Sequence, residues 1–208
     1  MGRCYLVVNK LKEARLTGVR IGIVITGSHC TVDEVIPQFI LLKNEGAILY
    51  PIFSYTVDET DNRFYDVLEL KRVIKDITEQ PIINTIVGAE PIGPKHLLDI
   101  VIIAPATGNT IAKLANGIVD TPALMAAKAQ LRNQRPVVIA VSSNDALSLN
   151  AKNIGTLLSM KHIYFVPFRQ DNPIEKANSL VSAMEKIPDT IVNALQGKQI
   201  QPVILGPC

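Results

Sequence analysis

The sequence contains no tryptophan and few residues that build cross-links or metal sites, with three cysteines and three histidines among 208 residues. The cysteines, Cys4, Cys30 and Cys208, are odd in number and far apart and include no C-x-x-C pair, so neither a disulfide framework nor a zinc site is indicated. This cysteine usage favours a reducing, cytoplasmic compartment. The histidines stand singly, without the spacing of metal ligands, and we expect no metal site.

An excess of charge of one sign and long apolar runs are also missing. Lysine and arginine number 21 and aspartate and glutamate 19, which leaves a net charge of +2 without a block of either sign. Binding to a phosphate backbone needs a clustered basic face, so we expect no nucleic-acid partner. A membrane-spanning helix needs about 18 or more consecutive apolar residues, and because no such run occurs we expect no membrane segment.

Apolar residues, by contrast, are plentiful, at 48% of the chain against 19% charged residues. A folded chain of this length buries about 70% of its unfolded surface, so one sizeable core is expected. The N-terminus has a short apolar patch among basic residues, too short and too interrupted for a secretory signal. We interpret residues 1–18 as an N-terminal leader outside the core and residues 19–208 as a single α/β domain.

Predicted strands and helices alternate from residue 20 onward, which is typical of parallel βαβ units. Apolar runs predict strands at 20–26, 47–54, 99–104, 137–141 and 163–166. The first and third runs are apolar nearly throughout, as in central strands that are covered on both faces. Pro51 in the second run removes a ladder donor and favours an edge position. Together these features predict a flavodoxin-like or Rossmann-like three-layer sandwich with a parallel sheet in the strand order 2-1-3-4-5.

The first helix has a clear start signal and one conflict. Thr31 to Glu34 match a capping box, and apolar residues follow at helical spacing until Gly46 provides a stop. Pro37 lies beyond the first turn of this helix. The helix is therefore expected either to begin later than the capping box indicates or to bend at the proline.

The remaining helices are predicted from apolar spacing and cap residues. They are expected at 63–78, 111–116, 122–131, 175–186 and 189–195. Phe64 and Leu68 are expected to point inward from the first of these. The stretch 88–94 contains two prolines and two glycines and is interpreted as a loop.

The loops that follow the strands are the expected place for a ligand, because open α/β sheets bind ligands beyond the carboxyl ends of their strands. These loops are 26–30, 54–56, 105–110 and 142–145. They are rich in hydroxyl, amide and glycine residues, and three of them lead into a helix N-terminus, which favours an anion by about 0.3–1 kcal/mol. The same residue types also cap helices and form turns, as Thr107 or Asn109 can. Because four such loops converge on one edge, we favour a site for a phosphate or carboxylate.

Neither G-x-G-x-x-G nor a Walker motif follows a strand, so a dinucleotide held in the Rossmann manner is not supported, whereas FMN fits more easily. His29 lies in the first strand-end loop, where an imidazole can donate to a ligand carboxylate or transfer a proton, or can simply face solvent or stack on a neighbouring ring. Lys113 can pair with ligand charge or be an ordinary surface lysine. Asp120 and Asp145 are interpreted as turn or cap residues.

Residues 103–120, Ile-Ala-Pro-Ala-Thr-Gly-Asn-Thr-Ile-Ala-Lys-Leu-Ala-Asn-Gly-Ile-Val-Asp, resemble the signature of the flavoprotein family that contains the FMN-dependent cysteine decarboxylases. Within this family, the chain is similar to the B subunits of dipicolinate synthases. The segments that carry this resemblance include Thr-Gly-Ser-His-Cys at 26–30, Ala-Glu-Pro-Ile-Gly-Pro-Lys at 89–95, Ser-Asn-Asp-Ala-Leu at 143–147 and Phe-Val-Pro-Phe at 165–168.

The resemblance implies a flavodoxin-like homo-oligomer that takes part in the last step of dipicolinate formation, in the mother-cell cytoplasm of a sporulating bacterium. In that step a dihydrodipicolinate-level precursor, a small dicarboxylate, is oxidised to the aromatic pyridine dicarboxylate. The resemblance also implies a companion A subunit with the nicotinamide (NADP) domain, which is absent here. This chain is then one part of a two-subunit enzyme.

By position, the resemblance implies FMN contacts in all four loops and substrate contacts in two of them. The implied FMN contacts are Gly27, Ser28, Ser54, Thr107, Asn109, Thr110, Ser142 and Ser143. Asn144 and His29 are expected to orient the substrate carboxylates. Two departures from the decarboxylases stand out: Pro91 occupies the place of their active histidine, and Val141-Ser-Ser-Asn144 keeps only the asparagine of their Pro-x-Met-Asn clamp.

Three functions are compatible with these features. The first is the oxidoreductase subunit just described. The second is a non-catalytic subunit that binds the substrate, or acts as a scaffold, and delivers it to a catalytic partner. The third is an FMN-dependent decarboxylase or prenyl-transfer enzyme, against which Pro91 and Ser143 argue.

Overall fold

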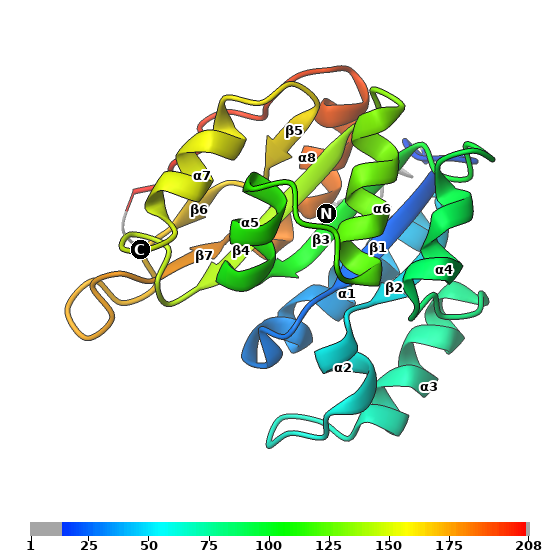
Figure 1. Ribbon diagram of the computed structural model, residues 1–208, viewed down its shortest axis with the longest axis horizontal. Coiled ribbons are helices and arrows are strands. Elements are labelled where there is room, and N and C mark those ends of the chain that lie inside the picture. Colours follow the sequence, from blue (N-terminus) through cyan, green and yellow to red (C-terminus); the bar gives the residue numbers. More distant parts are fainter. Residues whose placement is uncertain (1–13, 207–208) are drawn as a thin grey trace, which may run out of the picture.

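A mostly parallel sheet lies at the centre of a three-layer α/β sandwich in the computed structural model, which describes residues 14–206 (Figure 1). The parallel strands are β1 (Arg20–Ile25), β2 (Ile48–Phe53), β3 (Ile100–Ala106), β4 (Val137–Ser143) and β5 (Ile163–Phe165). They follow in the order β2-β1-β3-β4, and β5 pairs with β4. The predicted flavodoxin-like fold class and strand order 2-1-3-4-5 are confirmed, with Pro51 in the edge strand β2.

Helices cover both faces of the sheet because its strands are apolar on both sides. One face carries α1 (Val32–Asn44), α3 (Val67–Thr78) and α8 (Ile187–Leu195), and the other α5 (Gly108–Ala115), α6 (Pro122–Arg132) and α7 (Ala151–Leu158) (Figure 1). Strand β1 shows the division: Ile23 and Ile25 belong to one buried cluster and Val24 to the other. This double-sided burial holds the strand ends, and the loops that follow them, in fixed positions.

The sheet continues from the end of β4, beside β5, through a small antiparallel extension that the sequence did not suggest. This extension consists of β6 (Phe168–Arg169) and β7 (Leu180–Ser182), and the 3-10 turn η3 (Met184–Lys186) follows it. Ser142 of β4 lies opposite Val181 of β7. Because β4 extends beyond β5, its last backbone groups need another partner, and β7 provides it. The helix predicted over 175–186 is therefore wrong, and residues 170–179 form a hairpin loop at the carboxyl edge of the sheet.

The helix expected after Thr31 runs from Val32 to Asn44 and continues through Pro37. The predicted capping-box contact is not made, because the Thr31 side chain forms no cap hydrogen bond. Its hydroxyl lies instead 2.7 Å from the hydroxyl of Ser142. Thr31 resembles a helix cap in the sequence, but in the structure its side chain contacts a residue 111 positions away.

The second predicted helix begins later than expected. The chain forms the short helix α2 (Tyr55–Glu59) and then a loop, and α3 starts only at Val67, after Asp66 has accepted hydrogen bonds from the backbone of Leu68 and Glu69. The prediction that Phe64 and Leu68 point inward is wrong: they are 44% and 75% exposed. The cap at Asp66 leaves Phe64 in a loop, where helical spacing does not apply.

Smaller differences concern three other segments. The stretch 88–94, interpreted as a loop, overlaps the end of the helical turn α4 (Ile86–Ala89) and contains the turn η2 (Glu90–Ile92). Strand β3 continues through Pro105 to Ala106 instead of ending at the proline, with an irregular register between Ile103 and Ala106. Helix α7 had no counterpart in the prediction.

The predicted leader is described only from Ala14, and residues 1–13 lie outside the described residues. Residues 14–18 pack on the domain, because Leu16 is fully buried in the core and Arg15 pairs with Glu45 and Asp189. Within residues 14–206, none of the helices is long and apolar enough to cross a membrane.

Candidate functional site

Two adjoining cavities open at the carboxyl ends of the parallel strands. The first cavity measures about 820 Å³ and the second, which lies toward β2, about 390 Å³. Gly27, Thr107 and Asn109 line both. All four strand-end loops contribute, as expected from strands that point the same way.

The structure brings every site residue named from the sequence to one or both cavities. The first cavity is lined by Gly27, Ser28, His29, Thr107, Asn109, Ser142, Ser143 and Asn144. The second is lined by Gly27, Ser54, Thr107, Asn109 and Thr110. Which of these residues bind a cofactor and which bind a substrate stays a prediction.

The second cavity contains a buried hydroxyl that lacks a partner. Ser54, at the start of α2, is 8% exposed, and its Oγ makes no hydrogen bond within the described residues. Thr107 and Thr121 cap α5 and α6 at the same cavity. Lys113, a candidate for binding ligand charge, lies 2.6 Å from Asp120 in an ion pair. The second cavity therefore presents neutral donors and helix N-termini around one unsatisfied hydroxyl.

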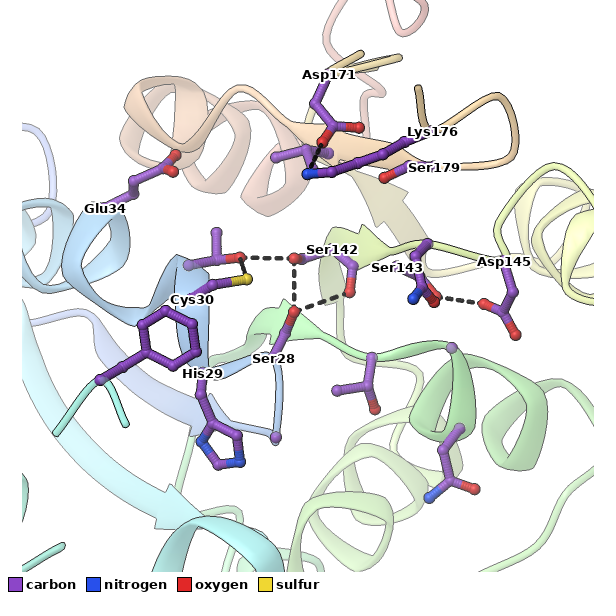
Figure 2. A pocket seen from close by; sticks show the side chains of 18 of the residues that line it. Ser28, His29, Cys30, Glu34, Ser142, Ser143, Asp145, Asp171, Lys176 and Ser179 are labelled. Carbon is purple, nitrogen blue, oxygen red and sulfur yellow. Dashed lines mark hydrogen bonds and ion pairs between the residues drawn. The ribbon is translucent and has the colours of Figure 1, made fainter. Parts of the chain in front are cut away.

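In the first cavity, three hydroxyls satisfy one another. The Oγ of Ser142 lies 2.7 Å from the Oγ of Ser28 and 2.7 Å from the Oγ1 of Thr31 (Figure 2). Ser142 and Thr31 are buried. These contacts join the end of β4 to the loop after β1, so the Ser142 hydroxyl holds the site together.

A second network surrounds Asp145, which the sequence pattern indicates only as a turn or cap residue. Ser143 Oγ donates to Asp145 Oδ1 (Figure 2). Asn150 Nδ2 donates to Asp145 Oδ2 over 2.7 Å. Asn153 supports Asn150 in turn, over 2.8 Å. A Cβ on Gly108 would lie 2.5 Å from Asp145 Oδ1, so only glycine lets the N-terminus of α5 approach this network so closely. Sequence patterns gave no sign of the partners, because they depend on how α5 and α7 pack.

His29 is held by two residues of the loop before α3. Its Nδ1 contacts the Tyr65 hydroxyl and lies 3.3 Å from Asn62 Nδ2, and its ring meets the Tyr65 ring edge-on. Burial lowers the pKa of His29 and raises the pKa of Tyr65 to about 12, so both groups are neutral at pH 7. A tyrosine hydroxyl and an amide NH₂ both donate, so Nδ1 accepts and Nε2 carries the proton. The ring points away from Ser28 and Ser142 (Figure 2).

Three charged side chains and one aromatic ring that the sequence analysis did not single out also line the first cavity. Arg63 and Phe64 reach it from the loop before α3, and Lys176 and Asp171 reach it from the hairpin loop. Lys176 lies 3.2 Å from Asp171. Both loops overlap segments predicted as helices, which is why these residues were missed.

Comparison with known proteins agrees with this architecture. The family model described as "Flavoprotein" matches residues 1–198, and the chain belongs to this family. The chain is 50% identical to the B subunit of dipicolinate synthase from Bacillus subtilis, over 91% of this chain and 95% of that protein. The crystal structure of the dipicolinate synthase B subunit from Bacillus halodurans superposes with a TM-score of 0.86 at 50% identity, over 93% of this chain and 99% of that one.

A more distant structure shares the fold. Burkholderia xenovorans DmrB, described as a cubic protein cage for redox transfer in complex with FMN, has a TM-score of 0.63 at 19% identity, over 86% of this chain and 96% of that one. Membership of the flavoprotein family makes FMN a candidate cofactor of this chain. The second cavity is compatible with its phosphate, because the buried Ser54 hydroxyl needs a hydrogen-bond partner that no described residue supplies.

Proposed function

We propose that this chain acts as the B subunit of a dipicolinate synthase, which oxidises a dihydrodipicolinate-level dicarboxylate to dipicolinate during sporulation. In this proposal the chain is a homo-oligomer and works with an A subunit that contributes the NADP site. The observation that carries the proposal is the pairing of two joined cavities. One has a buried, unsatisfied hydroxyl suited to a phosphate, and the other is large enough for a small ring and has charged side chains on its walls.

The second cavity would hold the phosphate end of FMN. Ser54 would donate its free hydroxyl, and Gly27 would let the phosphate approach the backbone closely, since a Cβ there would already lie 3.3 Å from Thr56 Cγ2. Thr107 and Asn109 line both cavities, and Thr110 lines the second; all three would contact the cofactor. When bound, FMN supplies an acceptor for hydride.

The first cavity would hold the dicarboxylate. Asn144 is exposed, lines this cavity and has an amide that can donate to a carboxylate. The Nε2–H of neutral His29 is a second donor, near Gly27. The oxidation removes a hydride and a proton from the ring, and aromatisation drives it. The protein therefore mainly needs to hold the ring in position.

Asn144→Ala tests this assignment. We expect the variant to fold normally, because no described hydrogen bond depends on the Asn144 side chain, and to abolish dipicolinate synthesis by the paired subunits. Asn178→Ala, an exposed asparagine outside both cavities, is the matched control and should keep full activity. Full activity of Asn144→Ala would contradict the assignment.

A visible spectrum of the purified chain tests the cofactor. After addition of FMN and removal of the excess, a retained and perturbed flavin spectrum would support hydride transfer in this chain. Loss of all flavin would contradict that part of the proposal and place hydride transfer on the nicotinamide of the A subunit.

A second candidate function is a binding subunit that presents the substrate to the A subunit. Several polar groups of the site already bond to other protein groups, which favours this second function. His29 Nδ1 holds a loop, and Ser142 and Ser143 bond to neighbouring side chains. Full synthesis by the A subunit alone would support this alternative.

A further inference from the structure

The loop between α2 and α3 is an ordered arm that reaches the first cavity. Asn62 Oδ1 accepts from the backbone N–H of Phe64 over 2.9 Å, and Asp61 Oδ1 accepts from that of Val67 over 2.9 Å. Asn62 and Tyr65 then bind His29, in the loop after β1. We call residues 61–66 the arm. Its position relative to the cavity is set by His29.

The arm carries a cation that has no counter-ion among residues 14–206. The guanidinium of Arg63 lies 4.8 Å from the centre of the Phe64 ring, and within the described residues it pairs with no carboxylate. Lys176, the other lysine or arginine that lines this cavity, is already paired with Asp171. An arginine that lines a cavity and rests on an aromatic face keeps its donor fork free for a ligand.

Phe64 adds an apolar surface beside that cation. It lines the same cavity and is 44% exposed, so its ring is accessible to a ligand there. A phenylalanine ring can pack on the face or edge of a flat six-membered ring. The arm thus places an apolar surface for a ring beside a cation for a carboxylate.

We propose that Arg63 binds one carboxylate of the substrate through paired N–H donors and that Phe64 packs on its ring. This rests on the proposed function and deepens it: the arm selects a ring with two carboxylates, one for Arg63 and one for Asn144 on the loop after β4. His29 then has two roles: its Nδ1 positions the arm through Asn62 and Tyr65, beside the donor role proposed for its Nε2–H. The fork of an arginine matches a carboxylate better than a lysine does.

The test is calorimetric titration of the full chain with pyridine-2,6-dicarboxylate and with pyridine-2-carboxylate, which lacks the second carboxylate. For the parent chain we expect tighter binding of the dicarboxylate. Arg63→Gln should weaken dicarboxylate binding at least about tenfold, as expected for loss of one charge-assisted pair, and should leave monocarboxylate binding nearly unchanged. Arg72→Gln makes the same change of charge on α3, outside the cavity, and should bind like the parent.

Two further variants separate the parts of the arm. Arg63→Lys keeps the charge without the fork and should recover only part of the affinity. Tyr65→Phe removes the hydroxyl that holds His29 and should weaken dicarboxylate binding severalfold without removing the preference for two carboxylates.

The outcomes separate this inference from the function on which it rests. If the parent chain binds the dicarboxylate and Arg63→Gln binds it equally well, the role of Arg63 is wrong while the proposed function stands. If the parent chain binds neither ligand, with or without FMN, both the proposed function and the role of Arg63 are overturned. Loss of the preference in Arg63→Gln, with Arg72→Gln unchanged, supports both.

Discussion

The two cavities share a wall but differ in what they leave unsatisfied. In the second cavity the charges pair with each other, Lys113 with Asp120, and a neutral hydroxyl, Ser54, is left over. In the first cavity the hydroxyls of Ser28 and Ser142 satisfy each other, and a cation, Arg63, is left over. A neutral donor among helix N-termini suits a phosphate, and a free guanidinium suits a carboxylate. Adjacent sites on one sheet edge can therefore select different anions by what their own side chains leave unpaired.

The largest effect is expected where the first cavity meets the Asp145 network. Gly108→Ala would place a Cβ 2.5 Å from Asp145 Oδ1 and 2.6 Å from Ser143 Oγ, so these groups must move. We expect the free energy of unfolding to fall by about 1–3 kcal/mol, as for overpacking, and dicarboxylate binding to weaken. Urea unfolding followed by circular dichroism measures the first effect.

Gly155→Ala is the control, because a Cβ there meets nothing within 4 Å and the residue lies inside α7. It should raise the free energy of unfolding by about 0.5–1 kcal/mol. Equal stability of the Gly108 and Gly155 variants would show that the network around Asp145 is not tightly packed.

Two serine variants test the comparison directly. Ser142→Ala removes a buried hydroxyl that contacts Ser28 and Thr31, so we expect a loss of about 1–2 kcal/mol in unfolding free energy. Ser54→Ala removes a buried hydroxyl without a partner, so its unfolding free energy should stay within about 0.5 kcal/mol of the parent while FMN retention falls. A large loss of stability in Ser54→Ala would mean that the hydroxyl serves the fold and not a ligand.

The anchoring of the arm predicts a dependence on pH. Burial holds the pKa of His29 below its ordinary value of 6.5, so the unfolded chain takes up a proton more readily than the folded chain does. The contribution of His29 to stability is therefore fully present above about pH 6.5 and decreases as the pH falls below that value. His29→Asn should show a flatter stability profile between pH 7 and pH 5 in thermal unfolding.

His96→Asn, at an exposed histidine outside both cavities, is the control and should follow the parent profile. Identical slopes for the parent and His29→Asn would show that His29 is not held in its neutral form.

The smallest effect is expected for Glu34, which lines the first cavity from the first turn of α1. Its negative charge opposes a dicarboxylate, so Glu34→Gln should raise dicarboxylate affinity about two- to threefold in calorimetry at low salt. The difference should shrink at high salt, because exposed charges are screened. An unchanged affinity at low salt would place Glu34 too far from the bound ligand to matter.

The sequence by itself determined the five parallel strands, their order and the edge at which the predicted site residues gather. Runs such as 99–104 are apolar throughout, which predicts a strand buried on both faces, and parallel strands must bring their following loops to one edge. For this reason all ten predicted site residues line the two cavities. Local patterns suffice for these features because they depend on neighbours in sequence and on the handedness of the chain.

Only the tertiary structure decided which polar groups satisfy each other. The partners of Ser142 and His29 lie 111–114 and 33–36 positions away, and no local pattern specifies them. The cap at Asp66 makes α3 begin later than predicted, so Arg63 lies in the arm and not in a helix. The end of β4 pairs with β7, so part of a predicted helix forms a strand. Hydrogen bonds and ion pairs are short-ranged, so which groups remain free for a ligand is settled only once the fold has brought distant segments together.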